Sequence, residues 1–327
     1  MPKIQKIRNW KQYNKSLRER GAIIFTFDKN YLSEFYYSGD QKRGGKRVYS
    51  AKMYEYLLSI KLLFRLPWRA VMGFAEGILR RVCIDGETAA TPDYAHASRE
   101  CSRLNLKVKP IALGDIKEGM EIAFDSTGVN VYSGSGWHQR KYGKNAVCKK
   151  AEQWKKIHVA MDINTMQIVA VSYTDSNVND CETVEELWGM IEGKIKSVRG
   201  DGAYDTEEFR RIIYEDGASA LIPPARTSKA QDELKHKPKV MKRHLNERDA
   251  MIKDIRRYED FDEGLKAWKE SSGYHKRSKI ETCMFRIKRI FGFNLHQKTT
   301  RGRVNEVITK MNLLNIFASL GMPRYTE

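Results

Sequence analysis

The chain has 327 residues, of which 41% are hydrophobic and 31% are charged, and its formal net charge is +18. This length suits two modest domains or one large domain with an extension. The basic excess indicates a polyanionic partner, and the lack of any apolar run of membrane-spanning length argues against a membrane protein. Five scattered cysteines without a C-x2-C pair argue against a structural zinc site, and their odd number without a signal peptide indicates a cytoplasmic protein.

The first 115 residues are predicted to be mainly helical. A basic helix is expected from Asn9 to Arg20, stopped by Gly21, and a short strand from Ala22 to Phe27. A basic, glycine-rich loop is expected from Ser38 to Val48. The region contains 22 Lys and Arg against 11 Asp and Glu, so it carries much of the basic excess.

Three further helices are predicted before residue 116. Ser50 is a suitable N-cap for the first, Leu66-Pro67-Trp68 begins the second, and Thr91-Pro92 places a capping residue before a proline at the start of the third. Short helices with basic ends are typical of a helix-turn-helix-like DNA-binding region, with Arg99 and Arg103 on the third helix as candidate DNA contacts. A plain helical bundle explains the same pattern equally well.

From residue 116 to residue 327, strands and helices alternate. Helices are predicted at Glu182–Ile195 and from Thr206 to Glu215, and strands at Ile122–Asp125, Val129–Tyr132, Ile157–Asp162, Ile168–Tyr173, Ile195–Gly200 and Ala220–Ile222. Adjacent strands followed by alternating helices and strands indicate a mixed α/β domain. Residues 225–270 are polar and helix-prone, and we interpret them as a helical or partly disordered insertion.

Three acidic residues stand in distinctive local surroundings. Asp125 follows the apolar run Ile122-Ala123-Phe124, Asp201 follows Val198-Arg199-Gly200, and Glu281 lies in a helix-like stretch. Two carboxylates at strand ends and a third on a later helix can converge on divalent cations. Such a set is the minimum for two-metal phosphodiester chemistry.

The helix-like stretch places four polar residues in one row. At about 100° per residue, Tyr274, Arg277, Glu281 and Lys288 fall within about 60° of one another, beside an apolar stripe of Ile280, Met284, Ile287 and Phe291. The row could hold a carboxylate at the border of a core. The alternative is a solvated face in which Arg277 pairs with Glu281, against which Tyr274 and Lys288 on the same row and the two preceding aspartates count. For Tyr274 alone, structural packing is the alternative. Residues 274–310 contain 10 Lys and Arg against 2 Asp and Glu, as a phosphate-handling site requires.

These motifs resemble those of a known protein family. Tyr274-x2-Arg277-x3-Glu281-x6-Lys288 is similar to the C-terminal signature of prokaryotic insertion-sequence transposases of the DDE type, and the residues around Asp125 and Asp201 are similar to the blocks around that family's two aspartates. Trp154-Lys155-Lys156-Ile157-His158 and Leu320-Gly321-Met322-Pro323 resemble the group related to insertion sequence five. The resemblance covers nearly the whole chain.

The resemblance implies a ribonuclease-H-like catalytic domain, in which Asp125 would end the first strand and Asp201 the fourth. It implies two Mg²⁺ or Mn²⁺ ions, bridged by Asp125 and held singly by Asp201 and Glu281. The partners would be double-stranded DNA (terminal inverted repeats and target DNA) and further copies of the chain in a synaptic complex, in a prokaryotic cytoplasm at the nucleoid. A transposase-derived regulator without catalysis and a ribonuclease-H-type nuclease are the alternatives.

Several other residues have two interpretations. Trp137, Arg140 and Lys141 follow a Gly-Ser turn and could grip DNA, although Trp137 could equally be buried at a sheet edge. Lys288 is expected to bind backbone phosphate, and Tyr274 and Arg277 to hold phosphate or to orient Glu281. Among competing groups, Asp162 and Asp175 are predicted turn residues, Asp205 begins a helix, and His158 is a hydrogen-bonded core histidine rather than a base.

Overall fold

The computed structural model describes residues 6–25, 33–41, 43–82, 90–111, 118–131, 154–234 and 240–324. The chain forms two compact units. The first unit combines Met1–Lys109 with Ile287–Glu327, and the second is Pro110–Arg286. The break after Lys109 lies close to the predicted boundary at 115. The C-terminal segment belongs to the same unit as the N-terminal helices, whereas the sequence placed it with the strands.

The first unit is helical. Its elements are α1 (Trp10–Ala22), the 3₁₀ helix η1 (Ile23–Phe25), α3 (Ala51–Phe64), α4 (Trp68–Val82), α5 (Tyr94–Arg103), β6 (Asn294–Leu295) and α13 (Thr300–Leu320). As predicted, Ser50 caps α3, because its hydroxyl accepts the Lys52 N–H over 3.1 Å. The predicted basic helix is also present, and it ends at Ala22 rather than at Gly21.

Two local predictions in this unit were wrong. The cap of α5 is Asp93, not Thr91, because the Asp93 carboxylate accepts the N–H of Ala95 at 2.8 Å and of His96 at 3.4 Å. The described part of the run predicted as a strand, residues 22–25, forms the end of α1 and then a 3₁₀ turn, and Thr26 and Phe27 lie outside the described residues. Ile24 is buried there and its carbonyl accepts from Tyr56. An apolar run needs a neighbouring strand to become one, and packing on α3 replaced that pairing.

A polar side chain of α13 hydrogen-bonds to the end of α5. Asn305 donates to the carbonyls of Cys101 and Leu104, at 3.0 and 2.8 Å, and so satisfies the end of α5. Glu306 and Lys310 form a fully buried pair at 3.0 Å. This pair lies within α13, so it is Asn305 that ties α13 to the end of α5.

The second unit is a mixed sheet covered by helices, which confirms the α/β prediction. The strands are β1 (Met120–Val131), β2 (Trp154–Asp162), β3 (Gln167–Asp175), β4 (Ile195–Arg199) and β5 (Ser219–Leu221), in the order β3-β2-β1-β4-β5. β1, β2 and β3 pair antiparallel, whereas β4 is parallel to β1 and β5 to β4. This order and these directions are those of a ribonuclease-H-like fold.

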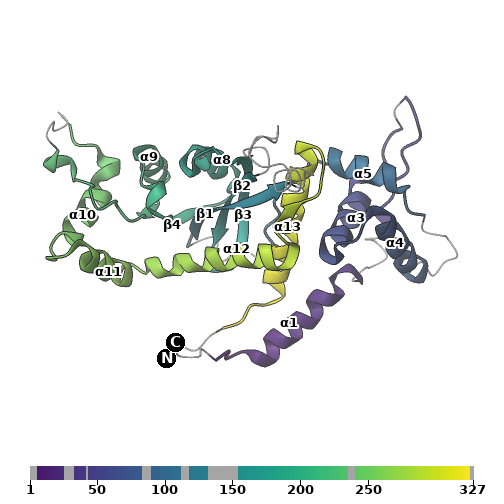
Figure 1. Ribbon diagram of the computed structural model, residues 1–327, viewed down its shortest axis with the longest axis horizontal. Helices are drawn as coiled ribbons and strands as arrows, with labels where there is room; N and C mark the ends of the chain where they lie inside the picture. Colours follow the sequence, from purple (N-terminus) through teal and green to yellow (C-terminus); the bar gives the residue numbers. More distant parts are fainter. Residues whose placement is uncertain are drawn as a thin grey trace, which may run out of the picture. The chain divides into compact units, whose positions relative to one another are not determined.

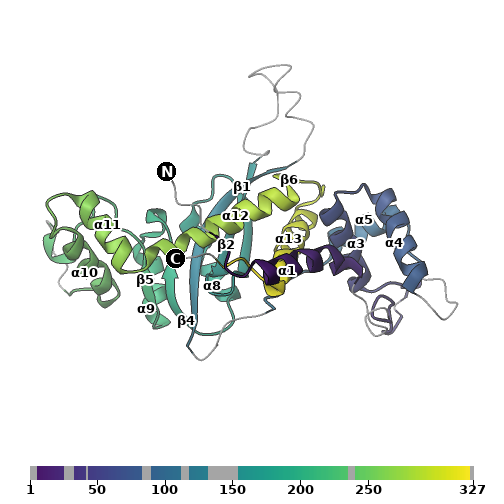
Figure 2. The same cartoon turned by 90° about the horizontal axis from the view of Figure 1, so that it is seen from below.

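Helices cover both faces of this sheet. The second unit contains η3 (Asp180–Thr183), α8 (Val184–Met190), η4 (Gly202–Tyr204), α9 (Glu207–Glu215), η5 (Gln231–Glu233), η6 (Arg243–Leu245), α10 (Asn246–Ile255), α11 (Phe261–Ser271), η7 (Tyr274–Arg277) and the first part of α12 (Ser278–Phe291). α8 and α9 lie on one side of the sheet, and α12 lies on the other (Figure 1). Figure 2 shows α12 crossing the strands.

The core of the second unit decides which way the β1 side chains point. Ile122 and Phe124 are fully buried in the cluster that includes Leu187 of α8 and Phe209 of α9. Since side chains alternate along a strand, Ala123 and Asp125 point to the opposite face, on the side of α12. The apolar pattern of β1 therefore assigns Asp125 to the α12 face of the sheet.

The remaining elements follow the predictions with changed bounds. The two strands predicted around Asp125 are one strand, because β2 pairs with it without interruption from Ile122 to Asn130. The predicted helix at 182–195 is shorter and ends at Met190. Thr206 caps α9 as predicted. Residues 225–270 form α10 and α11, with no strand in their described part.

Candidate active site

The two aspartates occupy matching positions on neighbouring strands. Parallel pairing of β1 with β4 ends at Ala123 opposite Arg199, and Asp125 and Asp201 each lie two residues beyond that pair. Asp125 lies within β1, since the strand continues to Val131, so the expectation that it ends the strand was wrong. Asp201 follows β4, as expected. The register of the sheet therefore brings these carboxylates to neighbouring places.

Local hydrogen bonds fix both aspartates. Asp125 accepts the N–H of Ser126 at 2.9 Å, and Asp201 accepts the N–H of Ala203 at 2.9 Å as the cap of η4. One oxygen of each carboxylate is thus committed to the backbone. The other oxygen of each stays available for a further partner.

A 3₁₀ turn, rather than an α-helix, carries the first half of the predicted polar row. Gly273, with φ of +68°, is in the left-handed region that glycine adopts freely, and Tyr274–Arg277 then form η7 before α12 begins. The α-helical angles used to align Tyr274 with Lys288 therefore do not hold along the whole row. The predicted apolar stripe is confirmed, because Ile280, Met284, Ile287 and Phe291 are all buried.

Tyr274 is an interior residue. It is only 9% exposed, packs on Trp268 with ring centres 5.5 Å apart, and donates from its hydroxyl to the Gly200 carbonyl over 3.0 Å. Gly200 directly precedes Asp201. Tyr274 thereby connects the turn before α12 to the backbone that presents the second aspartate.

Arg277 connects the strand acid to the helix acid. Its Nη2 donates to Glu281 over 2.8 Å, and its Nη1 lies 3.8 Å from the Asp125 carboxylate. Burial lowers the pKa of Arg277, but Tyr274 and the carboxylates of Asp125, Glu281 and Asp201 together raise it above its ordinary value. The guanidinium is therefore the positive centre of an acidic cluster.

Burial and the neighbouring carboxylates disfavour the charged form of Asp125 despite the nearby Arg277. The pKa of Asp125 is raised, chiefly because burial disfavours its charged form; Asp201 and Glu281 raise it further, against the Ser126 N–H and Arg277, which lower it. Carboxylate oxygens are the ligands that hard divalent cations prefer. The donor set thus fits Mg²⁺ or Mn²⁺, although within the described ranges no three such side chains are gathered closely enough to hold an ion.

A second ion pair, beside the cluster, was not predicted from the sequence. Glu121 accepts from Arg199 at 2.8 Å and lies 3.8 Å from Lys276, and Arg199 also donates to the Gly273 carbonyl at 3.4 Å. Burial alone would raise the pKa of Glu121, but Arg199 and Lys276 hold it below its ordinary value. Glu121 and Asp125 are spaced so that they lie on one face of the strand, and this spacing could have indicated that Glu121 lies near the site. The pair joins β1, β4 and the turn at Gly273.

The competing polar residues have structural roles. Asp162 accepts the N–H groups of Asn164 and Thr165 in a turn, as predicted. Asp205 is paired with Arg210 at 2.6 Å and with Arg248 at 3.0 Å. His158 is fully buried and hydrogen-bonded to Thr174 at 2.8 Å, as expected for a core histidine.

The other predicted DNA contacts belong to the first unit or lie outside the described residues. Trp137, Arg140 and Lys141 belong to the part of the chain that the structure does not describe. Lys288 is on α12, with its amine 5.3 Å from the centre of the Phe293 ring. Arg99 and Arg103 are exposed on α5, and Arg103 pairs with Glu100 at 2.9 Å.

Comparison with known proteins decides the family. Residues 117–316 match the sequence model of the transposase DDE domain, and residues 18–134 match a second model of the same description. The chain belongs to the transposase DDE domain family. It is therefore a transposase, an enzyme with DDE-type nuclease and transesterification activity. Transposase DDE domains generally use divalent metal ions.

Two solved transposase structures are similar to the chain. One is the cryo-EM structure of the piggyBac transposase synaptic complex with hairpin DNA, with 9% identity, a TM-score of 0.39, and coverage of 97% of this chain and 78% of that chain. The other is the Drosophila P element transposase strand transfer complex, with 11% identity, a TM-score of 0.31, and coverage of 95% and 89%. Among the described residues, no helix is long and apolar enough to cross a membrane.

Proposed function

We propose that Asp125, Asp201 and Glu281 are the acids with which this transposase holds two Mg²⁺ or Mn²⁺ ions, and that it belongs to the group related to insertion sequence five. One observation carries the proposal: Arg277 lies within ion-pair distance of both Asp125 and Glu281, while the sheet register places Asp201 beside Asp125. Two carboxylates from separate elements thus share one cation, and the third belongs to the strand end beside them.

The acids would hold the metal ions, and the residues around them would position the acids. Bound divalent ions would activate the attacking oxygen and stabilise the leaving oxygen. Asp125 is carried by the middle of a paired strand, which limits its movement. The Tyr274 hydroxyl donates to the Gly200 carbonyl and so fixes the backbone directly before Asp201. Arg277 orients Glu281, and its charge is available to a DNA phosphate once the carboxylates have other partners.

The substrate would be the ends of the element itself. Water attacks the phosphodiester at the end of the element and releases a 3′-hydroxyl. That hydroxyl then attacks a phosphodiester of target DNA, forming a new bond as the target's own 3′-oxygen leaves. The similar structures were solved as DNA complexes, one of them synaptic, which supports proposing terminal repeats, target DNA and several protomers as partners.

The net charge of +18 suits this substrate. Arg99, Arg103 and Lys288 are proposed phosphate contacts, with Trp137, Arg140 and Lys141 as further ones. Tyr274 is proposed as a positioning residue rather than a DNA contact, because it is buried and bonded to Gly200. The setting would be a prokaryotic cytoplasm, where insertion sequences reside.

Conservative substitution of each acid tests the assignment. Asp125→Asn, Asp201→Asn and Glu281→Gln should each slow cleavage of element-end DNA in Mg²⁺ roughly a thousandfold, because metal stabilisation of the transition state is worth several kcal/mol. Each should also reduce Mn²⁺ binding measured by electron paramagnetic resonance, while DNA affinity stays near wild type.

Asp216→Asn is the matched control, since this aspartate is exposed at the end of α9. It should leave cleavage and Mn²⁺ binding unchanged. Wild-type cleavage by any one of the three acid variants would remove that acid from the site. A wild-type protein that binds element ends but cuts them in neither metal would favour the regulator instead.

A further inference from the structure

The first unit contains a basic groove between α5 and the chain leading into α13. Its volume is about 760 Å³, and the residues that we call the α5 groove are Lys61, Trp68, Tyr94, Ala95, Ser98, Arg99, Ser102, Arg103, His296, Gln297, Lys298, Thr299 and Arg301. No Asp or Glu is among them. The groove thus combines helices from the N-terminal part with a segment close to the C-terminus.

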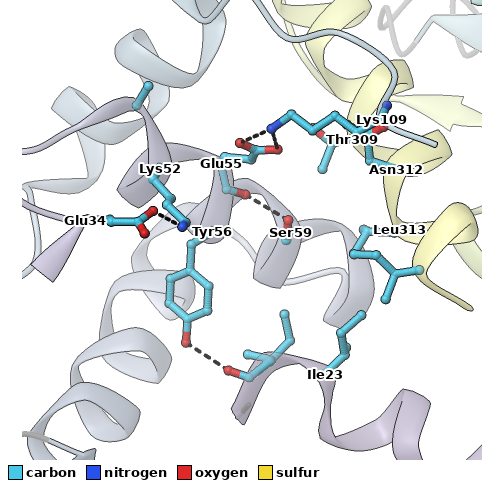
Figure 3. A pocket seen from close by; sticks show the side chains of 13 residues that line it. Ile23, Glu34, Lys52, Glu55, Tyr56, Ser59, Lys109, Thr309, Asn312 and Leu313 are labelled. Carbon is cyan, nitrogen blue, oxygen red and sulfur yellow. Dashed lines mark hydrogen bonds and ion pairs between the residues drawn. The ribbon is translucent and has the colours of Figure 1, made fainter. Parts of the chain in front are cut away.

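A second concavity of the same unit has a different electrostatic character. It has a volume of about 510 Å³, and the acid–base pairs Glu34–Lys52 and Glu55–Lys109 line it. Figure 3 shows the Glu34–Lys52 and Glu55–Lys109 ion pairs as dashed lines among the lining residues. The positive charges here are neutralised internally, so an anionic ligand gains little from this site.

Arg103 of the α5 groove pairs with Glu100, but other cations of the groove are not neutralised in this way. Arg99 and Lys298 are exposed, and within the described part of the chain neither forms an ion pair with a carboxylate. The Lys61 amine and the Arg301 Nε donate to the carbonyls of Leu66 and Leu104, each at 3.0 Å, and these bonds leave their charges in place. Unpaired cations on a concave surface focus a positive potential on whatever enters it.

The C-terminal side of the groove is rigidly built. Glu306 accepts the backbone N–H groups of His296 and Gln297, at 2.8 and 3.0 Å, and Ser102 of α5 donates to the Gln297 side chain at 3.3 Å. Arg303 donates to the Gln297 carbonyl at 3.0 Å. These bonds position Lys298 at a set place beside α5. Because the backbone at this wall is already fixed, a phosphate contact made from it costs less ordering.

The aromatic side chains of the groove are already covered by cations. The Lys61 amine lies 5.3 Å from the centre of the Trp68 ring, and the Arg69 guanidinium lies 4.6 Å from the centre of the Tyr94 ring. Arg69 also donates to the Tyr94 hydroxyl at 3.0 Å. Unpaired bases of a single strand would need free ring faces for stacking. The groove therefore favours phosphates of a duplex over the bases of a single strand.

We propose that the α5 groove docks the sugar–phosphate backbone of duplex DNA, with Arg99 on one wall and Lys298 and Arg301 on the other. The inference rests on the proposed function in so far as DNA is the partner. Phosphate contacts position a protein on a duplex but carry no sequence information directly. The groove accordingly contributes affinity and register, equally on element ends and on other DNA.

Salt dependence of binding tests this inference on the full chain. The groove variant is Arg99→Gln/Lys298→Gln, and the control Lys52→Gln/Lys109→Gln removes the same charge from the other concavity. Affinities for a 30-base-pair element end and for a scrambled duplex are measured in EDTA across salt concentrations. Loss of two phosphate contacts should lower the slope of log K against log salt by about 1.8, or about twelvefold in relative affinity between 50 and 200 mM.

The control should keep the wild-type slope, and thermal melting checks that both variants are folded. A groove variant that keeps the wild-type slope would overturn the inference, as would a loss confined to the element end or larger on single-stranded DNA. These results leave the proposed function untouched if wild type cuts its DNA in Mn²⁺. Failure of the wild-type protein to bind or cut any DNA would instead overturn the proposed function.

Discussion

Arg277 donates a hydrogen bond to the Glu281 carboxylate over 2.8 Å, across the junction between a 3₁₀ turn and helix α12. Its second terminal nitrogen lies 3.8 Å from Asp125. One side chain thus holds together two acids that come from a strand and a helix. In the absence of divalent ions, the guanidinium is the counter-charge of the cluster.

Arg277→Gln should therefore uncouple metal binding from catalysis. Removing the guanidinium leaves the carboxylates without their counter-charge, so Mn²⁺ should bind in the absence of DNA roughly threefold to tenfold more tightly, the gain being limited because Glu281 is half exposed. Cleavage should fall nonetheless, because Glu281 loses its orienting partner. Calorimetry measures the Mn²⁺ affinity. The control is Arg289→Gln, because Arg289 is exposed on the same helix, and it should change neither the Mn²⁺ affinity nor the cleavage rate. Weaker Mn²⁺ binding by Arg277→Gln would contradict the counter-charge role.

Tyr274→Phe should slow cleavage by roughly tenfold, with a stability cost of about 1 kcal/mol. The substitution removes the hydroxyl that donates to Gly200 and leaves that carbonyl without its partner, which loosens the backbone before Asp201. Tyr214→Phe is the matched control, because Tyr214 is half exposed on α9. Duplex affinity should remain near wild type. If duplex affinity fell with the cleavage rate, Tyr274 would be a DNA contact after all.

Lys288→Ala should impair transposition less than Glu281→Gln. The lysine lies on α12 beyond the acid, so its loss should remove a phosphate contact without removing a metal ligand. We expect the affinity for DNA ends to fall roughly tenfold and the slope of log K against log salt to become shallower by about 0.9. The metal titration should be unchanged. A transposition assay with a defined donor plasmid measures the effect. Wild-type frequency would mean that Lys288 is only a solvated lysine.

Arg210 and Arg211 are neighbours on α9 with opposite surroundings. Arg210 is 2% exposed, and it donates to Asp205 at 2.6 Å and to the Ile222 carbonyl at 2.9 Å. Arg210→Gln should cost about 3–5 kcal/mol of unfolding free energy, because Asp205 keeps a buried charge with one partner fewer. Arg211→Gln breaks only an exposed pair with Glu215 and should cost less than about 0.5 kcal/mol. Denaturant unfolding of both variants measures the contrast, and equal costs would contradict it.

His158 should make the stability of the protein depend on pH near neutrality. Burial lowers its pKa below the ordinary value of 6.5, with Lys156 lowering it further and Asp180 and Glu186 opposing. The folded state therefore holds the neutral form. The stability contribution is complete above about pH 6.5 and is lost as the pH falls towards the depressed pKa, with a slope of at most about 1.4 kcal/mol per pH unit.

His158→Gln should remove this component of the pH dependence, whatever its effect on absolute stability. Unfolding in denaturant at a series of pH values from 7.5 to 5 compares the variant with wild type. Parallel curves for the two proteins would show that His158 does not titrate in this range.

The sequence alone predicted features that depend on nearby residues. Ser50 and Thr206 cap their helices because a hydroxyl needs only the next turn to find its partner. The turn at Asp162 and the buried stripe of α12 follow from equally short-range patterns. The three acids could also be found, because each is carried by a recognisable local motif. The alternation of β1 shows which face Asp125 occupies once its neighbours are known to be buried.

Only the tertiary structure decided what depends on partners far apart in the chain. The run after Ala22 became a 3₁₀ turn because no strand pairs with it in the described part of its unit, and β1 became one long strand because β2 does pair with it. Sequence spacing aligned Arg277 with Glu281, but the strand register brought Asp125 to the same guanidinium. Lys298 joins Arg99 across about two hundred residues, because burial of α13 and its Glu306 bonds places that segment against α5. Contacts of this kind are set by packing of the whole chain, for which a local pattern carries no signal.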